Sequence, residues 1–242
     1  ALPISYTYWA RMRQKRREEG YPDLMPYFVQ AKAMLLEREP ETELSPNIRY
    51  IAGVEVAYNA LQNRLYGGVV IWDTERQEIV EAASHIEDIT LPYMQYYNGF
   101  MEAPVALKAM EKLRTKPDLI LCDGVGKNHP AQAGISRHIG VALKIPVIAC
   151  TEYSLFPMDK LDKLGKERGD SERSYASVLL RTHNGKPPVY VNGAYKISEA
   201  DICKWVLNLT PNTHLPIPII EVRKLLSPIV KERTHTPFLM YK

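Results

Sequence analysis

Residues 119–124 (LILCDG) contain four consecutive apolar residues, followed by an aspartate and a glycine. An unbroken apolar run that ends in a turn is typical of a central strand that is covered on both faces of a sheet. Residues 147–151 (VIACT) repeat this pattern, and a helical stretch at 131–143 separates the two runs. A strand, a helix and a second strand in this order predict parallel neighbours in an α/β sheet.

Upstream of this unit, the chain has the apolar and β-branched character of strands. The candidate strands are 48–58, 67–72 and 79–85. A polar turn at 73–77 joins the last two and predicts antiparallel pairing, and a helix is expected at 100–114. We therefore expect an α/β fold with a mixed central sheet, an antiparallel opening meander and flanking helices.

The C-terminal part of the chain has shorter signals. Asn184 and Gly185 lie between candidate strands at 176–182 and 189–191, and this dipeptide favours a hairpin turn. Ser198 is suited to cap a helix that runs to about residue 207. The last helix is expected at 219–226.

The N-terminal part differs from the rest because it is helical and basic. Helices are predicted at 5–19 and 24–39, and five basic residues crowd positions 11–17. These side chains could contact phosphates, form a solvated helix face or pack on another subunit. We expect a single domain over residues 1–242, with residues 1–46 as a helical, basic extension packed on it.

The composition excludes several classes of protein. At 45% hydrophobic and 24% charged residues, the chain is neither disordered, collagen-like nor a long coiled coil. No apolar stretch reaches the roughly 18 residues that cross a bilayer, so no membrane partner is expected. Cys122, Cys150 and Cys203 form no C-x-x-C pair, which argues against disulfides and structural zinc and favours a cytoplasmic or nuclear compartment. The net charge of +3 does not by itself indicate a nucleic-acid binder, and the sequence gives no oligomeric state.

Three carboxylates are candidates for a metal site. Glu55 lies in the middle of an apolar strand, where an anion is costly to bury unless it is paired or binds a cation. Asp123 ends the strand at 119–122, and Glu102 opens a helix. If the three converge, they form a site for a hard cation such as Mg²⁺. Alternatively, Glu55 is exposed, Glu102 favours the helix N-terminus and Asp123 is an ordinary turn residue.

Two loops carry further candidate residues. In residues 123–130 (DGVGKNHP), two glycines allow close approach of a ligand, and His129 precedes a helix start that could bind phosphate. The segment lacks the order of a Walker loop, and a glycine-rich turn with a structural histidine is the alternative. The aromatic loop at 92–97 could stack on bases or pack over the core.

Together these segments resemble the motifs of the endonuclease V family of repair nucleases. The similar segments are 51–58 (IAGVEVAY), the wedge 91–94 (LPYM), 100–104 (FMEAP), 123–130, Gly134, His138, Gly140, 145–146 (IP) and 215–218 (LPIP). The likeness extends over roughly residues 20 to 230 and is most specific at 123–130.

The resemblance implies a ribonuclease H-like fold and a Mg²⁺-dependent endonuclease, with Mn²⁺ as a substitute ion. Such enzymes recognise inosine, a deaminated base, in DNA or RNA and hydrolyse the second phosphodiester on its 3′ side. The implied partner is DNA or RNA that contains a deaminated or otherwise modified base.

The resemblance also implies a role for individual residues, because each occupies a position of a family motif. The roles are catalysis (Glu55, Glu102, Asp123 and His129, with the three carboxylates holding the metal), phosphate binding (Lys127 and His129), and base wedge and pocket (Pro92, Tyr93, Met94, Gly124 and Gly126). The wedge would fill the gap that a base leaves when it rotates out of the stack.

Several positions depart from the family pattern, three of them at or near the candidate site residues. Glu55 replaces an aspartate, Glu152 replaces a lysine and Tyr195 replaces a histidine. Glu152 is therefore an additional candidate metal ligand, and the role of Tyr195 is open. The departures leave a second hypothesis, a protein that binds nucleic acid without cutting it. A third is a nuclease with another substrate, because Gln95 and Tyr96 stand where the family has Pro-Gly.

Overall fold

The computed structural model describes residues 18, 35, 44–45, 47–59, 62–89, 97–124, 126, 134–152 and 178–228. Within these residues, one sheet has the strand order β3-β2-β1-β4-β5-β7-β6. Its strands are β1 (Tyr50–Asn59), β2 (Arg64–Asp73), β3 (Glu78–Asp88), β4 (Leu119–Asp123), β5 (Val147–Thr151), β6 (Val178–Leu180) and β7 (Val189–Tyr195). The helices are α3 (Gly99–Met110), α4 (Ile135–Leu143), α6 (Glu199–Asn208) and α7 (Ile217–Leu226).

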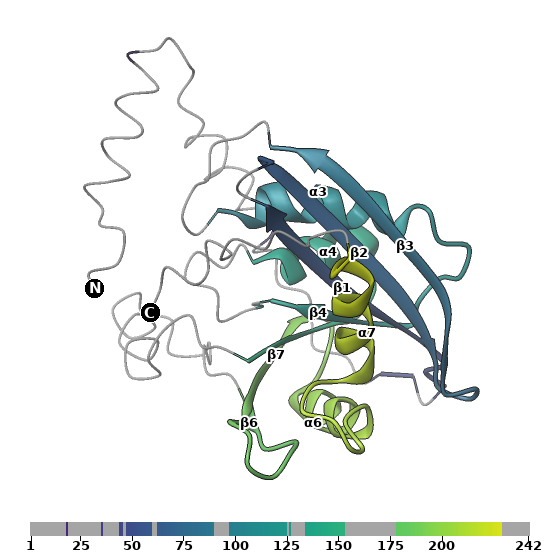
Figure 1. Ribbon diagram of the computed structural model, residues 1–242. Coiled ribbons are helices and arrows are strands. Elements are labelled where there is room, and N and C mark those ends of the chain that lie inside the picture. Colours follow the sequence, from purple (N-terminus) through teal and green to yellow (C-terminus); the bar gives the residue numbers. More distant parts are fainter. Residues whose placement is uncertain are drawn as a thin grey trace.

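The strand directions confirm the predicted mixed sheet (Figure 1). β1, β2 and β3 pair in antiparallel fashion and form the opening meander. β4 and β5 are parallel neighbours, as the strand–helix–strand pattern predicted, and β1 is also parallel to β4. β7 and β6 then return to antiparallel pairing, and the turn that contains Asn184 and Gly185 connects them.

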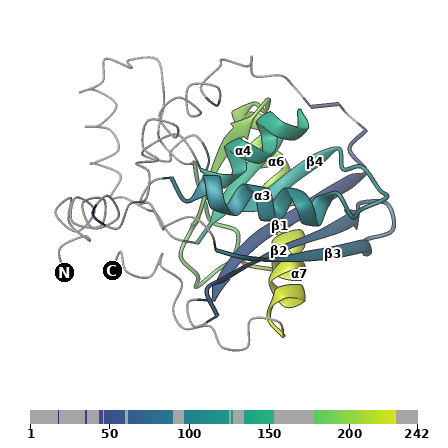
Figure 2. The ribbon, with the colours of Figure 1, turned by 90° about the horizontal axis from the view of Figure 1, so that it is seen from above.

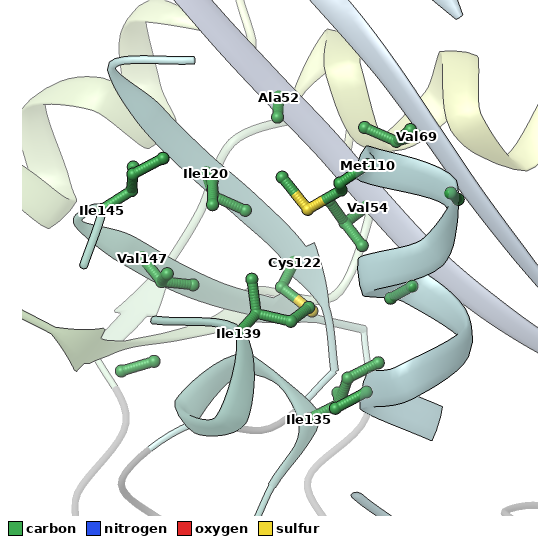
Figure 3. Close-up of a cluster of buried hydrophobic side chains, with 14 of the residues drawn as sticks. Ala52, Val54, Val69, Met110, Ile120, Cys122, Ile135, Ile139, Ile145 and Val147 are labelled. Carbon is green, nitrogen blue, oxygen red and sulfur yellow. The ribbon is translucent and has the colours of Figure 1, made fainter. Parts of the chain in front are cut away.

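Helices cover both faces of the sheet, and Figure 2 shows α3 and α4 side by side on one of them. Ile120 and Cys122 belong to the core cluster on the α3 and α4 face, whereas Leu119 and Leu121 belong to the cluster on the α6 and α7 face. All four side chains are fully buried, so a polar residue in this run would meet an apolar layer on either side. Figure 3 shows Cys122 beside Ile139 of α4 in the first of these clusters.

Helix α7 lies close against β1 and β2 because two glycines leave room for it. A Cβ atom on Gly53 would lie 2.2 Å from the carbonyl oxygen of Pro218, in the first turn of α7. A Cβ atom on Gly68 would lie 2.9 Å from Cγ of Leu226, at the other end of the helix. Because Gly68 pairs with Glu55, α7 runs toward the end of β1 that carries this carboxylate.

Several element boundaries differ from the predicted ones. The strand expected at 67–72 is β2, which begins at Arg64, and β3 continues to Asp88. The added part of β2 buries Leu65 and Tyr66, and at its end Arg64 Nε donates to Asp88 Oδ1 at 2.7 Å. The last helix begins at residue 217 rather than 219, directly after Pro216. Ser198 caps α6 as predicted, since its Oγ accepts a hydrogen bond from the Asp201 backbone N–H at 3.2 Å.

Only a small part of the predicted extension over residues 1–46 lies within the described residues. Leu35 is buried beside Tyr97, Phe100 and Val141. Its carbonyl oxygen accepts a hydrogen bond from Arg137 Nε at 2.7 Å. These contacts concern Leu35 alone, so the packed extension over residues 1–46 stays a prediction. The helices predicted at 5–19 and 24–39 otherwise lie outside the described residues. No helix of the described part is long and apolar enough to span a membrane.

Candidate active site

Acidic side chains lie at the level where the parallel strands β4 and β5 end. Glu55 is in the middle of β1 but level with Asp123, because Val54 pairs with Cys122. Asp123 ends β4 and Glu152 follows β5 directly. Side chains alternate between the two faces of a strand, so Glu55 lies on the same face as Gly53, which contacts α7. By the same alternation Asp123 follows Leu121 onto that face. The fold thus gathers three carboxylates from separate segments on the α7 side of one sheet edge.

Glu102 belongs to α3, which covers the opposite face of the sheet from α7. The pKa of the buried Cys122 thiol is raised well above its usual value, first by burial and then by the negative charges of Asp123, Glu102 and Glu55. A single thiol therefore lies within the electrostatic reach of all three predicted metal ligands. Among the described residues, however, no three His, Cys, Asp or Glu side chains are close enough to hold one ion as they stand.

The Glu102 carboxyl is held in an apolar setting with one polar contact. Its Oε1 accepts a hydrogen bond from Asn98 Nδ2 at 2.9 Å. Burial raises the pKa of Glu102 to about 7, and the Asn98 contact offsets only part of that effect. Glu102 can therefore gain or lose a proton near neutral pH, which is uncommon for a carboxylic acid and typical of functional sites.

We expect Glu102→Gln to stabilise the metal-free protein at about pH 8 by at most about 3 kcal/mol. The pKa of Glu102 is about 7 in the folded protein and about 4.5 in the unfolded chain. The wild type therefore loses this stability as the pH rises from the lower value to the higher one, whereas glutamine does not titrate. Denaturant melts in EDTA at about pH 5 and pH 8 measure the difference.

The control for this prediction is Glu111→Gln, an exposed position at the C-terminal end of the same helix. It should change the free energy of unfolding equally at both pH values. If Glu102→Gln also gives the same difference at both pH values, burial does not control the protonation of Glu102.

An arginine that the sequence analysis did not identify occupies the centre of the site. Arg223 of α7 donates from Nε to Asp123 Oδ2 at 2.7 Å and from Nη1 to Glu152 Oε2 at 2.6 Å. On the other side of Glu152, Nε2 of His214 lies 3.4 Å from Oε1. Glu152, predicted as an additional metal ligand, is thus ion-paired with a guanidinium. Sequence patterns offered no signal for these contacts, because 71 and 100 residues separate the partners.

The two glycines of the predicted base pocket have close neighbours within the protein. A Cβ atom on Gly126 would lie 2.1 Å from Oδ1 of Asn192 and 3.0 Å from the Cβ of Ala149. A Cβ atom on Gly124 would lie 3.0 Å from Cγ2 of Ile135. A side chain at position 126 would have to displace Asn192, so packing against β5 and β7 is itself a reason for glycine there. The role of both residues in a base pocket stays a prediction.

Tyr195 lies at the opposite end of the sheet from the carboxylates. It pairs with Val147 at the start of β5, whereas Asp123 pairs with Cys150 near the end of that strand. Three residues of strand correspond to roughly 10 Å. The Tyr195 ring is fully buried and lies within 5.4 to 5.9 Å of three cationic groups, which belong to Arg137, Lys144 and Lys196. The fold does not bring Tyr195 to the candidate site.

The remaining predicted site residues lie outside the described part of the chain. They are Pro92, Tyr93 and Met94 of the wedge, and Lys127 and His129 of the phosphate-binding segment. Their roles stay predictions.

Solved structures with the same fold are endonucleases V. The Streptomyces avermitilis endonuclease V has a TM-score of 0.73 and 23% identity, covering 90% of this chain and 97% of that structure. The catalytic domain of human endonuclease V has a TM-score of 0.73 and 19% identity, covering 87% and 99%. The Ciona intestinalis endonuclease V, solved with a 24mer DNA that contains an inosine followed by a ribo-adenosine, has a TM-score of 0.68 and 17% identity, covering 86% and 98%. These similarities confirm the predicted ribonuclease H-like fold.

Sequence comparison identifies the family independently. The family model described as Endonuclease V matches residues 31–222. The endonuclease V of Dictyoglomus thermophilum is 30% identical over 196 residues, which are 79% of this chain and 84% of that protein. The endonuclease V of Trichormus variabilis is 32% identical over 181 residues, which are 73% of this chain and 81% of that protein. The matched range includes β1, α3 and β4, and the chain therefore belongs to the endonuclease V family.

Proposed function

We propose that this protein is a divalent-metal-dependent endonuclease that recognises inosine in DNA or RNA and hydrolyses a phosphodiester on its 3′ side. The observation that supports the proposal is the pair of carboxylates, Glu55 and Asp123, that β1 and β4 carry at the same level on the α7 side of the sheet. The family membership supports a nuclease, and the inosine-containing complex of the Ciona relative supports this class of ligand. The free thiols of Cys122 and Cys150 support a reducing cytoplasmic or nuclear compartment.

The chemistry of the acidic side chains suits Mg²⁺, or Mn²⁺ in its place. Carboxylate oxygens are the hard ligands that these ions prefer, and Glu55, Glu102 and Asp123 would hold the ion. A bound divalent ion supplies an activated water and neutralises charge that builds on the phosphate oxygens. In the metal-free protein, burial raises the pKa of Glu102 to about 7, so binding of an ion by this carboxylate would be coupled to loss of a proton near neutral pH.

The reaction needs water, the phosphodiester and groups that place them. Water adds to phosphorus and the bond to the 3′ oxygen breaks, which leaves a 3′-hydroxyl and a 5′-phosphate. Lys127 and His129 would bind the phosphate, while Gly124 and Gly126 would line the pocket for the rotated base. Tyr93, with Pro92 and Met94 beside it, would fill the gap left in the stack.

The test is cleavage of end-labelled DNA and RNA oligonucleotides that carry one inosine, with adenosine in the matched controls. With Mg²⁺ or Mn²⁺ we expect a single product, cut at the second phosphodiester 3′ of inosine, and no product in EDTA. Equal cutting of inosine and adenosine strands would contradict inosine recognition. Cutting in EDTA would contradict the metal requirement.

The Arg223 guanidinium on Asp123 favours a second candidate, a family member that binds inosine-containing nucleic acid without cutting it. A cation already paired with a proposed metal ligand could leave binding intact while it prevents hydrolysis. Fluorescence anisotropy with the same oligonucleotides separates the two functions. Tight, inosine-dependent binding with no product in either metal would support the second candidate.

A further inference from the structure

A single guanidinium bridges two carboxylates of the candidate site. Arg223 is 30% exposed, Asp123 12% and Glu152 27%, so the three charged side chains lie in a partly water-excluded setting. The N···O distances of 2.7 and 2.6 Å are at the short end for charge-assisted hydrogen bonds. Such bonds are stronger when water is partly excluded, because the effective dielectric constant is lower.

Two features hold this guanidinium in place. Burial would lower the pKa of Arg223, but the charges and hydrogen bonds of Asp123 and Glu152 together raise it, so the group is always a cation. The backbone of α7 is fixed by close contacts of Pro218 with Gly53 and of Leu226 with Gly68. Arg223 thus comes from a firmly seated helix.

We propose that Arg223 is the resident cation of this site and a positioning residue for Asp123, so that a divalent ion must compete with it. In this arrangement Glu152 holds Arg223 and is not a metal ligand. The inference rests on the proposed function only in taking Asp123 as a metal ligand.

The charges of the site lead to this conclusion. Asp123 and Glu152 contribute two negative charges, of which Arg223 neutralises one. A divalent ion near Asp123 meets both the repulsion of the guanidinium and the loss of a short hydrogen bond. The pairing also accounts for an acidic residue at position 152, because a lysine there would place a second positive charge beside Arg223 where Glu152 now accepts a hydrogen bond.

The experiment measures Mn²⁺ binding to the full chain, without nucleic acid, by titration calorimetry and by electron paramagnetic resonance. We expect Arg223→Gln to bind Mn²⁺ at least about tenfold more tightly than the wild type, because a nearby positive charge is removed. We expect Glu152→Gln to change the affinity less than about threefold, since Arg223 retains its bond to Asp123. Lys224→Gln is the matched control, because it removes one positive charge from an exposed neighbour that pairs with Glu221; its affinity should equal that of the wild type.

Two results would overturn the proposal. One is an Arg223→Gln protein that binds Mn²⁺ no more tightly than Lys224→Gln. The other is a loss of Mn²⁺ affinity of about tenfold or more in Glu152→Gln, which would identify Glu152 as a metal ligand.

If Arg223→Gln does not fold, Arg223→Lys serves in its place, since lysine keeps the charge but cannot bridge both carboxylates with a planar fork. It should bind Mn²⁺ a few times more tightly than the wild type, and an unchanged affinity would again overturn the proposal.

Metal affinity and cleavage are separate readouts. A protein that shows the expected Mn²⁺ affinities but cuts no oligonucleotide would retain this proposal and lose the proposed nuclease function. If the protein cuts at inosine but its variants do not show these affinity changes, the nuclease function is supported and the proposal for Arg223 is overturned.

Discussion

Asp123→Asn is expected to lower the single-turnover rate of cleavage beside inosine by a factor on the order of 10³. The substitution keeps the shape of the side chain but removes the negative charge at the end of β4. That charge is one of the three that act on Cys122, and it is the one paired with Arg223. The loss should appear in the chemical step, because the amide can still accept a hydrogen bond from Arg223. The measurement is the rate with enzyme in excess over an end-labelled oligonucleotide.

Asp118→Asn is the control for this prediction, since it makes the same change just before the start of the same strand. Asp118 Oδ2 accepts hydrogen bonds from the backbone N–H groups of Arg49 and Tyr50, at the edge of the sheet away from the site. Its substitution should affect stability and leave the rate unchanged. An Asp123→Asn protein that cuts within tenfold of the wild type would exclude Asp123 from the catalytic machinery.

Gly53→Ala is expected to lower the free energy of unfolding by about 3 kcal/mol or more, because it overpacks a rigid contact. The added Cβ would lie 2.2 Å from the Pro218 carbonyl oxygen and 2.5 Å from its carbonyl carbon. Both atoms are backbone, so no side-chain rotation can relieve the clash. Either β1 or α7 must therefore move. A movement of α7 would also draw Arg223 away from Asp123. Guanidinium denaturation followed by circular dichroism measures the change.

Gly185→Ala is the matched control, with the same added methyl group in an open place. No heavy atom lies within 4 Å of a Cβ at Gly185, but its φ of +75° is unfavourable for alanine. We therefore expect a cost of about 1 kcal/mol from backbone strain alone. Equal destabilisation by the two substitutions would mean that α7 is not seated against β1 as described.

The parts of this fold that could be predicted from the sequence are those with a local signal. The apolar run at 119–122 predicted a central strand because both faces of β4 are buried. Asn184 and Gly185 predicted the β6–β7 hairpin because their turn preference is intrinsic.

The parts that could not be predicted depend on how distant segments meet. Arg223 contacts Asp123 only because α7 folds back over β1, and no sequence pattern near residue 223 predicts that contact. Gly126 suggested a ligand, yet Asn192 of β7 is the neighbour that excludes a side chain there. The motif around Tyr195 left its role in the site open, and the pairing of β7 with β5 places it at the start of β5, away from Asp123. In each case strand register or helix docking decided the outcome.

The position of the β6–β7 hairpin has a practical consequence for protein engineering. β6 is an outer strand of the sheet, and β5 and β7 separate it from β4 and Asp123. The connection between β6 and β7 is solvent-facing, with Gly185 in open space. Exposed loop tips of this kind tolerate inserted sequence. A fluorophore, an affinity tag or a reporter domain attached there would leave the acidic groups and α7 undisturbed.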